Sequence, residues 1–361
     1  MTSVPYSIQD VYNGEAKNRF TVVSTFAGGG GSSTGYRLAG GNILAINEFI
    51  PSAVDTYLAN YPKTIIFPGD IRELTGKMIL DRLKLSPGEL DILDGSPPCA
   101  SFSTSGKREK GWGKVKKYSD TTQRVDDLFF EFIRILKEVQ PKVFVSENVK
   151  GLSIGIAKGV LGTLNRGFGL CQSETILSEF QKCGYKVRWK ILNAADYGVP
   201  QTRQRLIIIG VRNDLGLTPS FPKRTVNKWV SLREAFEGVD TTNNGFPFNK
   251  KNRTEQWQMK CLPGQSVSDL HPRGSYFNFG RYNPDQPSPT LLQATAGKYH
   301  VHYSEDRYPN IIEGKRIQGF PDDYILLGDL HQQWERLGRS VPPLMMEAIA
   351  KHIYRHILRE I

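Results

Sequence analysis

The sequence predicts a doubly wound α/β fold, in which helices cover both faces of a central sheet. Short apolar runs rich in Val and Ile alternate with segments of helical periodicity as far as about residue 212. The runs are mostly continuous rather than alternating, which is typical of strands buried on both faces. The expected strands are residues 21–25, 43–47, 91–94, 142–146, 186–192 and 205–211.

One helix is expected between the strands 91–94 and 142–146. Its apolar residues recur at spacings of three and four and therefore form one stripe; they are Val125, Leu128, Phe129, Phe132, Ile135, Leu136 and Val139. Pro141 ends this helix. A last helix is expected after Ser340, with Pro342 and Pro343 in its first turn.

Composition divides the chain after residue 212. Residues 213–285 are rich in Pro, Gly, Asn and aromatic side chains, have weak periodicity, and carry ten Lys or Arg against seven Asp or Glu. We therefore expect a main domain over residues 1–212 and a small irregular domain over 213–285. Regular structure resumes near residue 310, and residues 286–361 are expected to return to the main domain and complete it.

The net charge of +11 and the pI of about 9.4 suit a polyanionic partner. Residues 106–117 alone carry six basic side chains and one acidic one. Such a run by itself is more often a solvated loop. No apolar run could span a bilayer and the N-terminus does not resemble a signal peptide, so we expect a cytoplasmic protein with no membrane association.

A glycine-rich turn follows the first expected strand, in the segment FAGGGGSSTGYRLAGG. Glycines let backbone amides approach a ligand at a helix N-terminus. Glu48 ends the second strand, where a carboxylate can bind the hydroxyls of an adenosine ribose, and Asp70 ends the third unit. This pattern indicates a nucleoside cofactor and leaves open whether it is NAD or S-adenosylmethionine.

Cys99 is one of four cysteines, none of which form a CxxC pair, so no metal site is expected. It lies in LDGSPPCASFS, directly after a strand, at the edge of the sheet where ligands bind in this architecture. A thiolate there could be a covalent nucleophile. A buried small side chain is an equally good interpretation of this segment alone.

Two further segments carry polar residues at strand ends. Glu147 and Asn148 are expected just past the end of a strand, beside Cys99. In VPQTRQRLIIIGVR, Gln201, Arg203 and Arg205 alternate into a strand, which predicts that the two arginines point to one face. Each segment by itself is more often structural than catalytic.

In this order the segments resemble the cytosine carbon-5 DNA methyltransferase family, of the bacterial or phage type. The match covers almost the whole chain. The family's motifs match FAGGGG, SPPCASFS, ENV and QTRQR, followed by PSPTLL at 287–292, RIQGFPDDY at 316–324 and GRSVPP at 338–343. The resemblance implies a Rossmann-like, S-adenosylmethionine-dependent methyltransferase sheet with a small target-recognition domain at 213–285.

The resemblance also implies the catalytic residues. Cys99 would attack carbon 6 of cytosine, Glu147 would bind the ring edge at nitrogen 3, and Arg203 and Arg205 would supply positive charge. The target base would be flipped out of the duplex, and the basic loop 106–117 would close over the DNA.

The implied cofactor is S-adenosyl-L-methionine. Phe26 would stack on its adenine, Glu48 would bind the ribose, and Asp70 would bind the adenine amino group. The full set of cofactor residues implied by the resemblance is Phe26, Gly28, Gly29, Gly31, Glu48, Phe49, Asp70, Ile71, Pro98, Leu128, Arg339 and Ser340. The implied partner is double-stranded DNA, bound by a monomer associated with the nucleoid, and a cognate restriction endonuclease is a further candidate partner.

The sequence departs from the family's pattern at three places. The usual Asp-Leu-Phe is Ser24-Thr25-Phe26, the Gln that commonly follows the nucleophile is Ala100, and the usual Asn of Gly-Asn-Ser/Ala-Val is Arg339. Arg339 is a permanent cation near the expected position of a cationic sulfonium. It could pair with the cofactor's amino-acid carboxylate or point to solvent.

Three functions besides DNA methylation are compatible with the sequence. Arg339 could pair with the extra carboxylate of carboxy-S-adenosyl-L-methionine, which would give 5-carboxymethylcytosine. The fold would also suit a DNA-binding protein without catalytic activity, or a transfer-RNA methyltransferase. The intact Cys99, Glu147, Arg203 and Arg205 argue against a non-catalytic protein, and the long recognition region argues against a transfer-RNA substrate.

Overall fold

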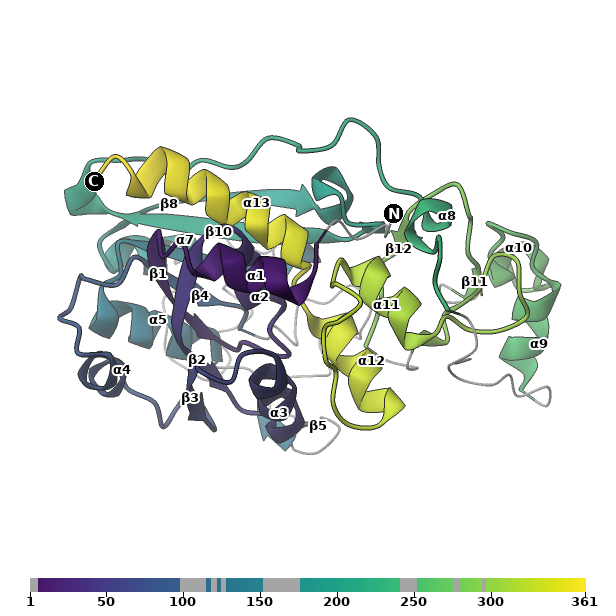
Figure 1. Ribbon diagram of the computed structural model, residues 1–361, viewed down its shortest axis with the longest axis horizontal. Helices are drawn as coiled ribbons and strands as arrows, with labels where there is room; N and C mark the ends of the chain where they lie inside the picture. Colours follow the sequence, from purple (N-terminus) through teal and green to yellow (C-terminus); the bar gives the residue numbers. More distant parts are fainter. Residues whose placement is uncertain are drawn as a thin grey trace.

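A seven-stranded sheet forms the centre of the structure (Figure 1). The computed structural model describes residues 6–97, 115–117, 122–124, 128–151, 176–240, 252–274, 279–293 and 297–361. In spatial order the strands are β3 (Ile65–Pro68), β2 (Gly41–Glu48), β1 (Phe20–Thr25), β4 (Ile92–Gly95), β7 (Val143–Val149), β10 (Gln204–Arg212) and β8 (Tyr185–Asn193). All are parallel except β10, which is antiparallel to both β7 and β8.

The six expected strands are present, and the structure corrects them in four ways. β3 was not expected, because its sequence IIFP has only four residues; in the structure none of them is fully buried. β7 extends to Val149, so Glu147 and Asn148 lie within a strand rather than past its end. β8 alternates between exposed and less exposed residues because it is an edge strand. Val115–Lys117, the end of the expected basic loop, forms β5, which pairs with β6 (Thr122–Arg124).

Helices cover both faces of the sheet. They are α1 (Ile8–Glu15), α2 (Gly31–Leu38), α3 (Pro51–Asn60), α4 (Gly76–Leu83), α5 (Leu128–Val139), α7 (Ile176–Lys182), α8 (Leu232–Ala235), α9 (Arg253–Lys260), α10 (Val267–Leu270), α11 (Ile311–Gln318), α12 (Leu330–Arg339) and α13 (Pro343–Ile353). The expected helix before Pro141 is α5, although Val125 lies outside the described residues. The expected last helix is α13, with Pro342 as its N-cap and Pro343 as its first residue.

Two hydrophobic clusters lie on opposite faces of the sheet. Adjacent residues of a strand belong to different clusters. Val22 and Ile207 lie in the cluster under α1, α2 and α13. Val23 and Ile208, which follow them in the sequence, lie in the cluster under α4, α5 and α7. Successive side chains of a strand point to opposite faces, so a strand covered on both sides is apolar throughout. The expected doubly wound class is confirmed by this arrangement.

From Leu232 onward, the described parts of residues 213–285 form short helices and a two-residue pairing at one end of the molecule, where α9 and α10 lie in Figure 1. Residues 213–228 instead run along the main domain, where Leu215, Leu217 and Phe221 pack against its core. β11 (Gly280–Arg281) pairs in parallel with β13 (His300–Val301). This pairing crosses the domain boundary that we expect at residue 285. β12 (Ser288–Pro289) instead pairs with β9 (Gln201–Thr202), which returns the chain to the main domain.

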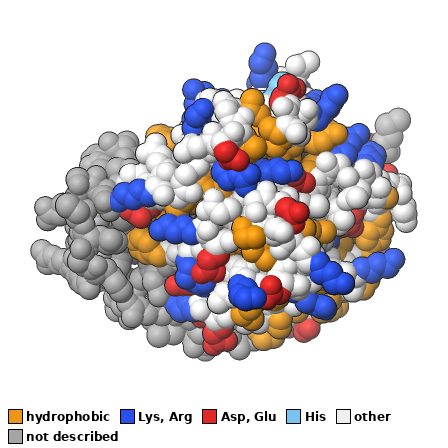
Figure 2. All heavy atoms as spheres, turned by 90° about the vertical axis from the view of Figure 1, so that its left-hand side faces the viewer, with side chains coloured by type: hydrophobic (Ala, Val, Ile, Leu, Met, Phe, Trp, Pro, Cys, Tyr) orange, Lys and Arg blue, Asp and Glu red, His pale blue; other side chains and the backbone are white. Residues whose placement is uncertain are grey.

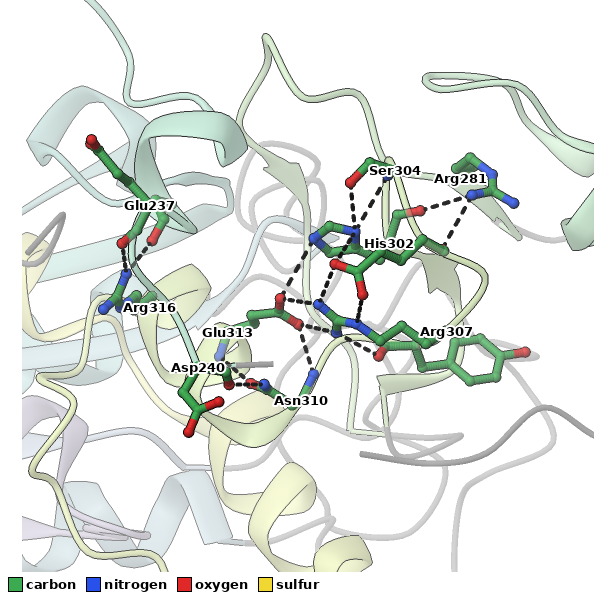
Figure 3. Close-up of polar contacts among 12 residues, drawn as sticks. Glu237, Asp240, Arg281, His302, Ser304, Arg307, Asn310, Glu313 and Arg316 are labelled. Carbon is green, nitrogen blue, oxygen red and sulfur yellow. Dashed lines mark hydrogen bonds and ion pairs between the residues drawn. The ribbon is translucent and has the colours of Figure 1, made fainter. Parts of the chain in front are cut away.

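A buried ionic network joins this end of the molecule to α11 (Figure 3). Glu313 is 1% exposed and accepts hydrogen bonds from Nη1 and Nη2 of Arg307, both at 2.7 Å, and from the backbone amide of Asn310 at 2.8 Å. His302 lies 3.5 Å from the same carboxylate. Asn310 also donates to the carbonyl of Asp240. The network therefore joins Asp240, before the expected boundary at residue 285, to residues after that boundary.

Charge is mixed on the face of the main domain shown in Figure 2, where Lys and Arg side chains are interspersed with Asp and Glu. The surplus of +11 is therefore not gathered into a single patch on that face. In the parts of the chain that the structure describes, no helix is both long and apolar enough to cross a membrane.

Replacing Glu313 by Ala should destabilise the protein by about 3–5 kcal/mol, because it leaves the Arg307 guanidinium buried without its principal counter-charge. Urea unfolding measures the change. The matched control is Asp285→Ala, which removes an ion pair to Arg233 whose side chains are 70% and 61% exposed and should cost less than about 1 kcal/mol. Equal losses in the two variants would contradict the assignment of Glu313 as the centre of the network.

Candidate active site

The turn between β1 and α2 is held in an unusual backbone conformation. Phe26 has φ +55°, which is rare for a bulky residue, and Gly28 and Gly30 have φ +57° and +91°. Open space surrounds the position of a Cβ at Gly28, whereas at Gly30 it would meet the hydroxyl of Tyr324. Strained residues of this kind persist where the surroundings impose them, and they concentrate at ligand sites.

Glu48, at the end of β2, ties this turn to the next one. Its Oε2 accepts a hydrogen bond from the amide of Gly28 at 2.6 Å, and its Oε1 accepts from the amides of Phe49 and Ile50 at 2.9 and 2.8 Å. The side chain is 6% exposed. A carboxylate has about four acceptor positions, so Glu48 retains capacity for a hydroxyl group while it holds both loops.

The other residues expected to bind the cofactor on this side of the sheet converge on one apolar cluster. Ile71 and Leu128 belong to it, and Phe26 and Phe49 are half-buried against it. Asp70 accepts from the amide of Arg72 at 3.0 Å and forms an ion pair with its guanidinium at 2.8 Å. The structure therefore brings together residues that are as much as 102 positions apart, from Phe26 to Leu128.

The C-terminal part of the chain closes the other side of the glycine turn. A Cβ at Gly31 would lie 3.0 Å from Cβ of Ser340, and one at Gly29 would lie 3.4 Å from Cβ of Arg336. Ser340 Oγ donates to the carbonyl of Arg336 at 2.6 Å, and its own carbonyl accepts from Gln318 Nε2 at 2.6 Å. Ser340 is thus placed beside the loop as expected, although its hydroxyl is used within α12.

Arg339 forms an ion pair with Glu335, one turn earlier on α12. Its side chain is 22% exposed, so it does not simply extend into solvent. The sequence left open which carboxylate balances this cation. In the structure a carboxylate of the protein, that of Glu335, lies against Arg339.

Glu147 and Arg205 form the central pair of the expected catalytic group. Arg205 Nε lies 2.9 Å from Glu147 Oε1, and the side chains are 13% and 11% exposed. Arg205 faces Val149 in the register of β10 against β7, so its side chain is the diagonal neighbour of Glu147 on one face. Burial lowers the pKa of Arg205, and Glu147 opposes that shift.

Asn148 connects this pair to the nucleophile segment. Its Nδ2 donates to the carbonyl of Pro97 at 3.0 Å, and the side chain is 4% exposed. Pro97 is the last described residue before that segment. Cys99 and Pro98 lie outside the described residues, as does most of the basic loop 106–117. The anchored carbonyl is two residues from Cys99 in the sequence.

Arg203 occupies a different position from the one predicted. It lies between β9 and β10 rather than within one continuous strand, so the expected alternation is interrupted there. Its Nη1 and Nη2 donate to the carbonyls of Leu291 and Gly338, each at 3.1 Å. The side chain is 2% exposed, and burial, with Arg205 nearby, holds its pKa well below the usual value. Arg203 therefore joins the QTRQR segment to two parts of the return segment.

Asp94, at the end of β4, is a buried carboxylate near the expected catalytic group that the sequence did not single out. It is 1% exposed, and it accepts from Ser24 Oγ at 2.7 Å and from the Tyr36 hydroxyl at 3.2 Å. Burial raises its pKa to about 7, and the charge of Glu147 adds to the effect. The sequence did contain a signal for this residue, namely a carboxylate in the otherwise apolar strand ILDG. Its partner in the neighbouring strand is Ser24, at a position where the family usually has Asp.

Metal ligands are not gathered anywhere in the described residues: no group of three or more His, Cys, Asp or Glu side chains could hold an ion there. Cys183 and Cys261, the two cysteines in described positions, are buried free thiols. Burial raises the pKa of both thiols, which disfavours the reactive thiolate.

The family model for C-5 cytosine-specific DNA methylases matches residues 20–355 of the chain. The chain is 31% identical over 348 residues to Type II methyltransferase M1.HphI of Haemophilus parahaemolyticus, covering 93% of the chain and 87% of the relative. It is 30% identical over 372 residues to Type II methyltransferase M.NgoPII of Neisseria gonorrhoeae, covering 95% of the chain and 97% of the relative.

Two solved structures share the fold. One is described as a DNA modification methyltransferase encoded within a prophage (E. coli); its TM-score is 0.72 at 20% identity, with 94% of this chain and 99% of that chain covered. The other is DNMT2 of Spodoptera frugiperda, with a TM-score of 0.61 at 18% identity over 91% of this chain and 97% of that chain. They confirm the expected Rossmann-like methyltransferase class of the sheet.

Asp94→Asn should change how stability depends on pH. The carboxyl group loses its proton near pH 4 when unfolded and near pH 7 when folded, so the wild type loses stability as the pH rises between these values. Asn carries no such titration. Urea unfolding from pH 5 to pH 8 should therefore show the wild type losing stability relative to the variant, and parallel curves for the two proteins would contradict the assignment.

Proposed function

Since the chain belongs to the C-5 cytosine-specific DNA methylase family, we propose that it transfers a methyl group from S-adenosylmethionine to carbon 5 of a cytosine in duplex DNA through a covalent adduct on Cys99. The observation that carries the mechanism is the Glu147–Arg205 pair on β7 and β10, beside Asn148, which holds the carbonyl of Pro97. An acid, a cation and the start of the nucleophile segment thus meet at one edge of the sheet.

The residues around the glycine turn suit S-adenosylmethionine. Gly28 leaves open space, Glu48 has spare acceptor capacity for ribose hydroxyls, and Phe26 offers an aromatic ring half-buried against the apolar cluster. Asp70 and Ile71 follow β3 on the adenine side. When bound, the cofactor supplies an electrophilic methyl group. Gly29, Gly31, Phe49, Pro98, Leu128, Arg339 and Ser340 are proposed to complete its site.

Cys99 begins the proposed reaction by adding its thiolate to carbon 6 of the ring. The carbon–sulfur bond forms and the displaced electron pair moves toward ring nitrogen 3, where Glu147 shares a proton with the ring. Arg205 stabilises the negative charge that Glu147 and the ring share. Carbon 5 then bonds to the methyl group as the bond from that methyl to the donor sulfur breaks, which leaves S-adenosylhomocysteine. A water removes the carbon 5 proton, and the bond between carbon 6 and the Cys99 sulfur breaks to return the thiolate.

Arg203 is proposed to act with Arg205 at the carbonyl side of the base. Its guanidinium is anchored on the carbonyls of Leu291 and Gly338, which would fix the position of its charge. A cation held in place before the reaction costs no reorganisation as charge develops.

Duplex DNA is the proposed partner. Carbon 6 of a stacked cytosine is out of reach of a side chain, so the base has to be flipped out at a cost of roughly a few kcal/mol. Residues 213–285 are proposed to read base edges, and the basic loop 106–117 to close over the backbone. We also propose that the protein acts as a monomer in the cytoplasm, on nucleoid DNA. Its proposed protein partner is a cognate restriction endonuclease.

Methyl is the proposed transferred group, rather than carboxymethyl. A carboxymethyl donor was suggested by Arg339, a cation that would need a carboxylate near the donor. The ion pair with Glu335 provides that counter-charge within α12. The Glu147, Arg205 and Asn148 arrangement also argues against a protein that binds DNA without catalysis, because a binding surface does not require a buried acid beside the nucleophile segment.

DNA containing 5-fluorocytosine should form a covalent adduct with the wild type, because fluorine cannot leave as the carbon 5 proton does. A denaturing gel with S-adenosylmethionine present shows the adduct as a shifted band. Cys99→Ser should abolish the band, and Cys183→Ser, at a buried free thiol, should retain it. Absence of the band in the wild type would favour a non-catalytic DNA-binding protein.

Glu147→Gln should lower kcat about 10²- to 10⁴-fold, because the amide cannot share a proton with ring nitrogen 3. Its KM for S-adenosylmethionine should change little, since Glu147 lies on β7, which is separated by β4 from β1, the strand that leads into the glycine turn. Steady-state methylation of DNA measures both. The control is Glu89→Gln, an exposed residue bonded to the amide of Ser86, which should leave kcat unchanged. A kcat near that of the wild type in Glu147→Gln refutes the assigned role.

A further inference from the structure

Arg336 is a buried arginine that the family resemblance did not single out. It lies on α12 and is 2% exposed. A Cβ at Gly29 would lie 3.4 Å from Cβ of Arg336 and 3.6 Å from its Cγ and Cδ. The stem of Arg336 therefore runs along the glycine turn proposed to hold the cofactor.

The guanidinium of Arg336 is poorly satisfied. Its Nη2 lies 3.1 Å from Glu335 Oε2, but neither Nε nor Nη2 has a hydrogen bond to any described residue. Arg316 is buried to the same extent, yet it is paired twice with Asp322 and donates to the carbonyls of Ala235 and Glu237 (Figure 3). Buried N–H groups without acceptors are rare and require an explanation.

Glu335 cannot fully neutralise this arginine. Its other oxygen, Oε1, forms the ion pair with Arg339, so one carboxylate faces two guanidinium groups. The side chain of Glu335 is 6% exposed and that of Arg336 is 2% exposed, so solvent screening is weak. The surroundings of Arg336 thus favour a further anionic group at the glycine turn.

Resting on the proposed function, we propose that Arg336 binds the α-carboxylate of the methionine end of the donor. A carboxylate matches the fork of a guanidinium and accepts from two N–H groups at once. Glu48 contacts the turn at Gly28 and Arg336 contacts it at Gly29, so a ribose near Glu48 leaves the amino-acid end on the side of Arg336. A DNA phosphate is a poorer candidate because the side chain is buried.

Calorimetric titration with two nucleosides tests this role. S-adenosylhomocysteine carries the amino-acid end, whereas 5′-methylthioadenosine has a methyl group in its place. Arg336→Met should weaken the binding of S-adenosylhomocysteine at least about tenfold. It should change the affinity for 5′-methylthioadenosine less than about twofold. Arg316→Met is the matched control, since it removes an equally buried arginine and should leave the ratio of the two affinities unchanged.

Glu335→Gln provides a second variant of opposite expected sign. It removes the negative charge that competes for Arg336, so S-adenosylhomocysteine should bind severalfold more tightly relative to 5′-methylthioadenosine. A purely structural ion pair would instead weaken the binding of both ligands together. Because Glu335 also pairs with Arg339, the substitution is compared in an Arg339→Gln background, where it decides the matter if Arg336→Met does not fold.

An unchanged affinity ratio in Glu335→Gln, or an equal loss for both ligands in Arg336→Met, overturns the assignment of Arg336 and leaves the proposed function standing. A wild type that binds neither nucleoside overturns the proposed cofactor as well. The two failures are therefore distinguishable.

Discussion

Polar groups at the carboxyl edge of a sheet buried on both faces must be paired, and the rest of the site follows from that constraint. These groups are largely shielded from water, so each carboxylate finds donors within the protein. Glu48 holds three backbone amides of two loops, Asp94 holds two hydroxyls, and Glu147 holds Arg205. The pairs shape the loops before any ligand binds, which reduces the ordering that binding would otherwise require.

The departure at Ser24 shows how this constraint is met when a motif residue changes. The family usually has a carboxylate at this position of β1, and here the hydroxyl of Ser24 donates to Asp94 instead. Ser24 and Asp94 are partners in the register of β1 against β4, so in this pair the carboxylate lies on β4, at the same edge of the sheet. A residue that looks isolated in the sequence is therefore paired across two strands.

The return segment is held by arginines rather than by apolar packing alone. Arg203 reaches the carbonyls of Leu291 and Gly338, and Arg336 and Arg339 share Glu335 beside the glycine turn. These contacts join segments separated by 88 and 135 positions, through Arg203, and bring the C-terminal motif to the cofactor loop. The departure at Arg339 belongs to this system of buried charge.

The sequence by itself determined the fold class, six of the seven strands, the end of the helix before Pro141, the start of the last helix, and the place of the glycine turn after β1. Those features depend on local periodicity, on prolines and glycines, and on residues adjacent in the chain. Tertiary structure alone decided that β10 runs antiparallel, that Arg203 leaves the strand for the return segment, and that Asp94, Glu335 and Arg336 lie beside expected site residues. The partners of these residues lie on other strands or helices, and some contacts depend on which way a helix faces. A local sequence pattern does not encode how a buried charge will be shared between such partners.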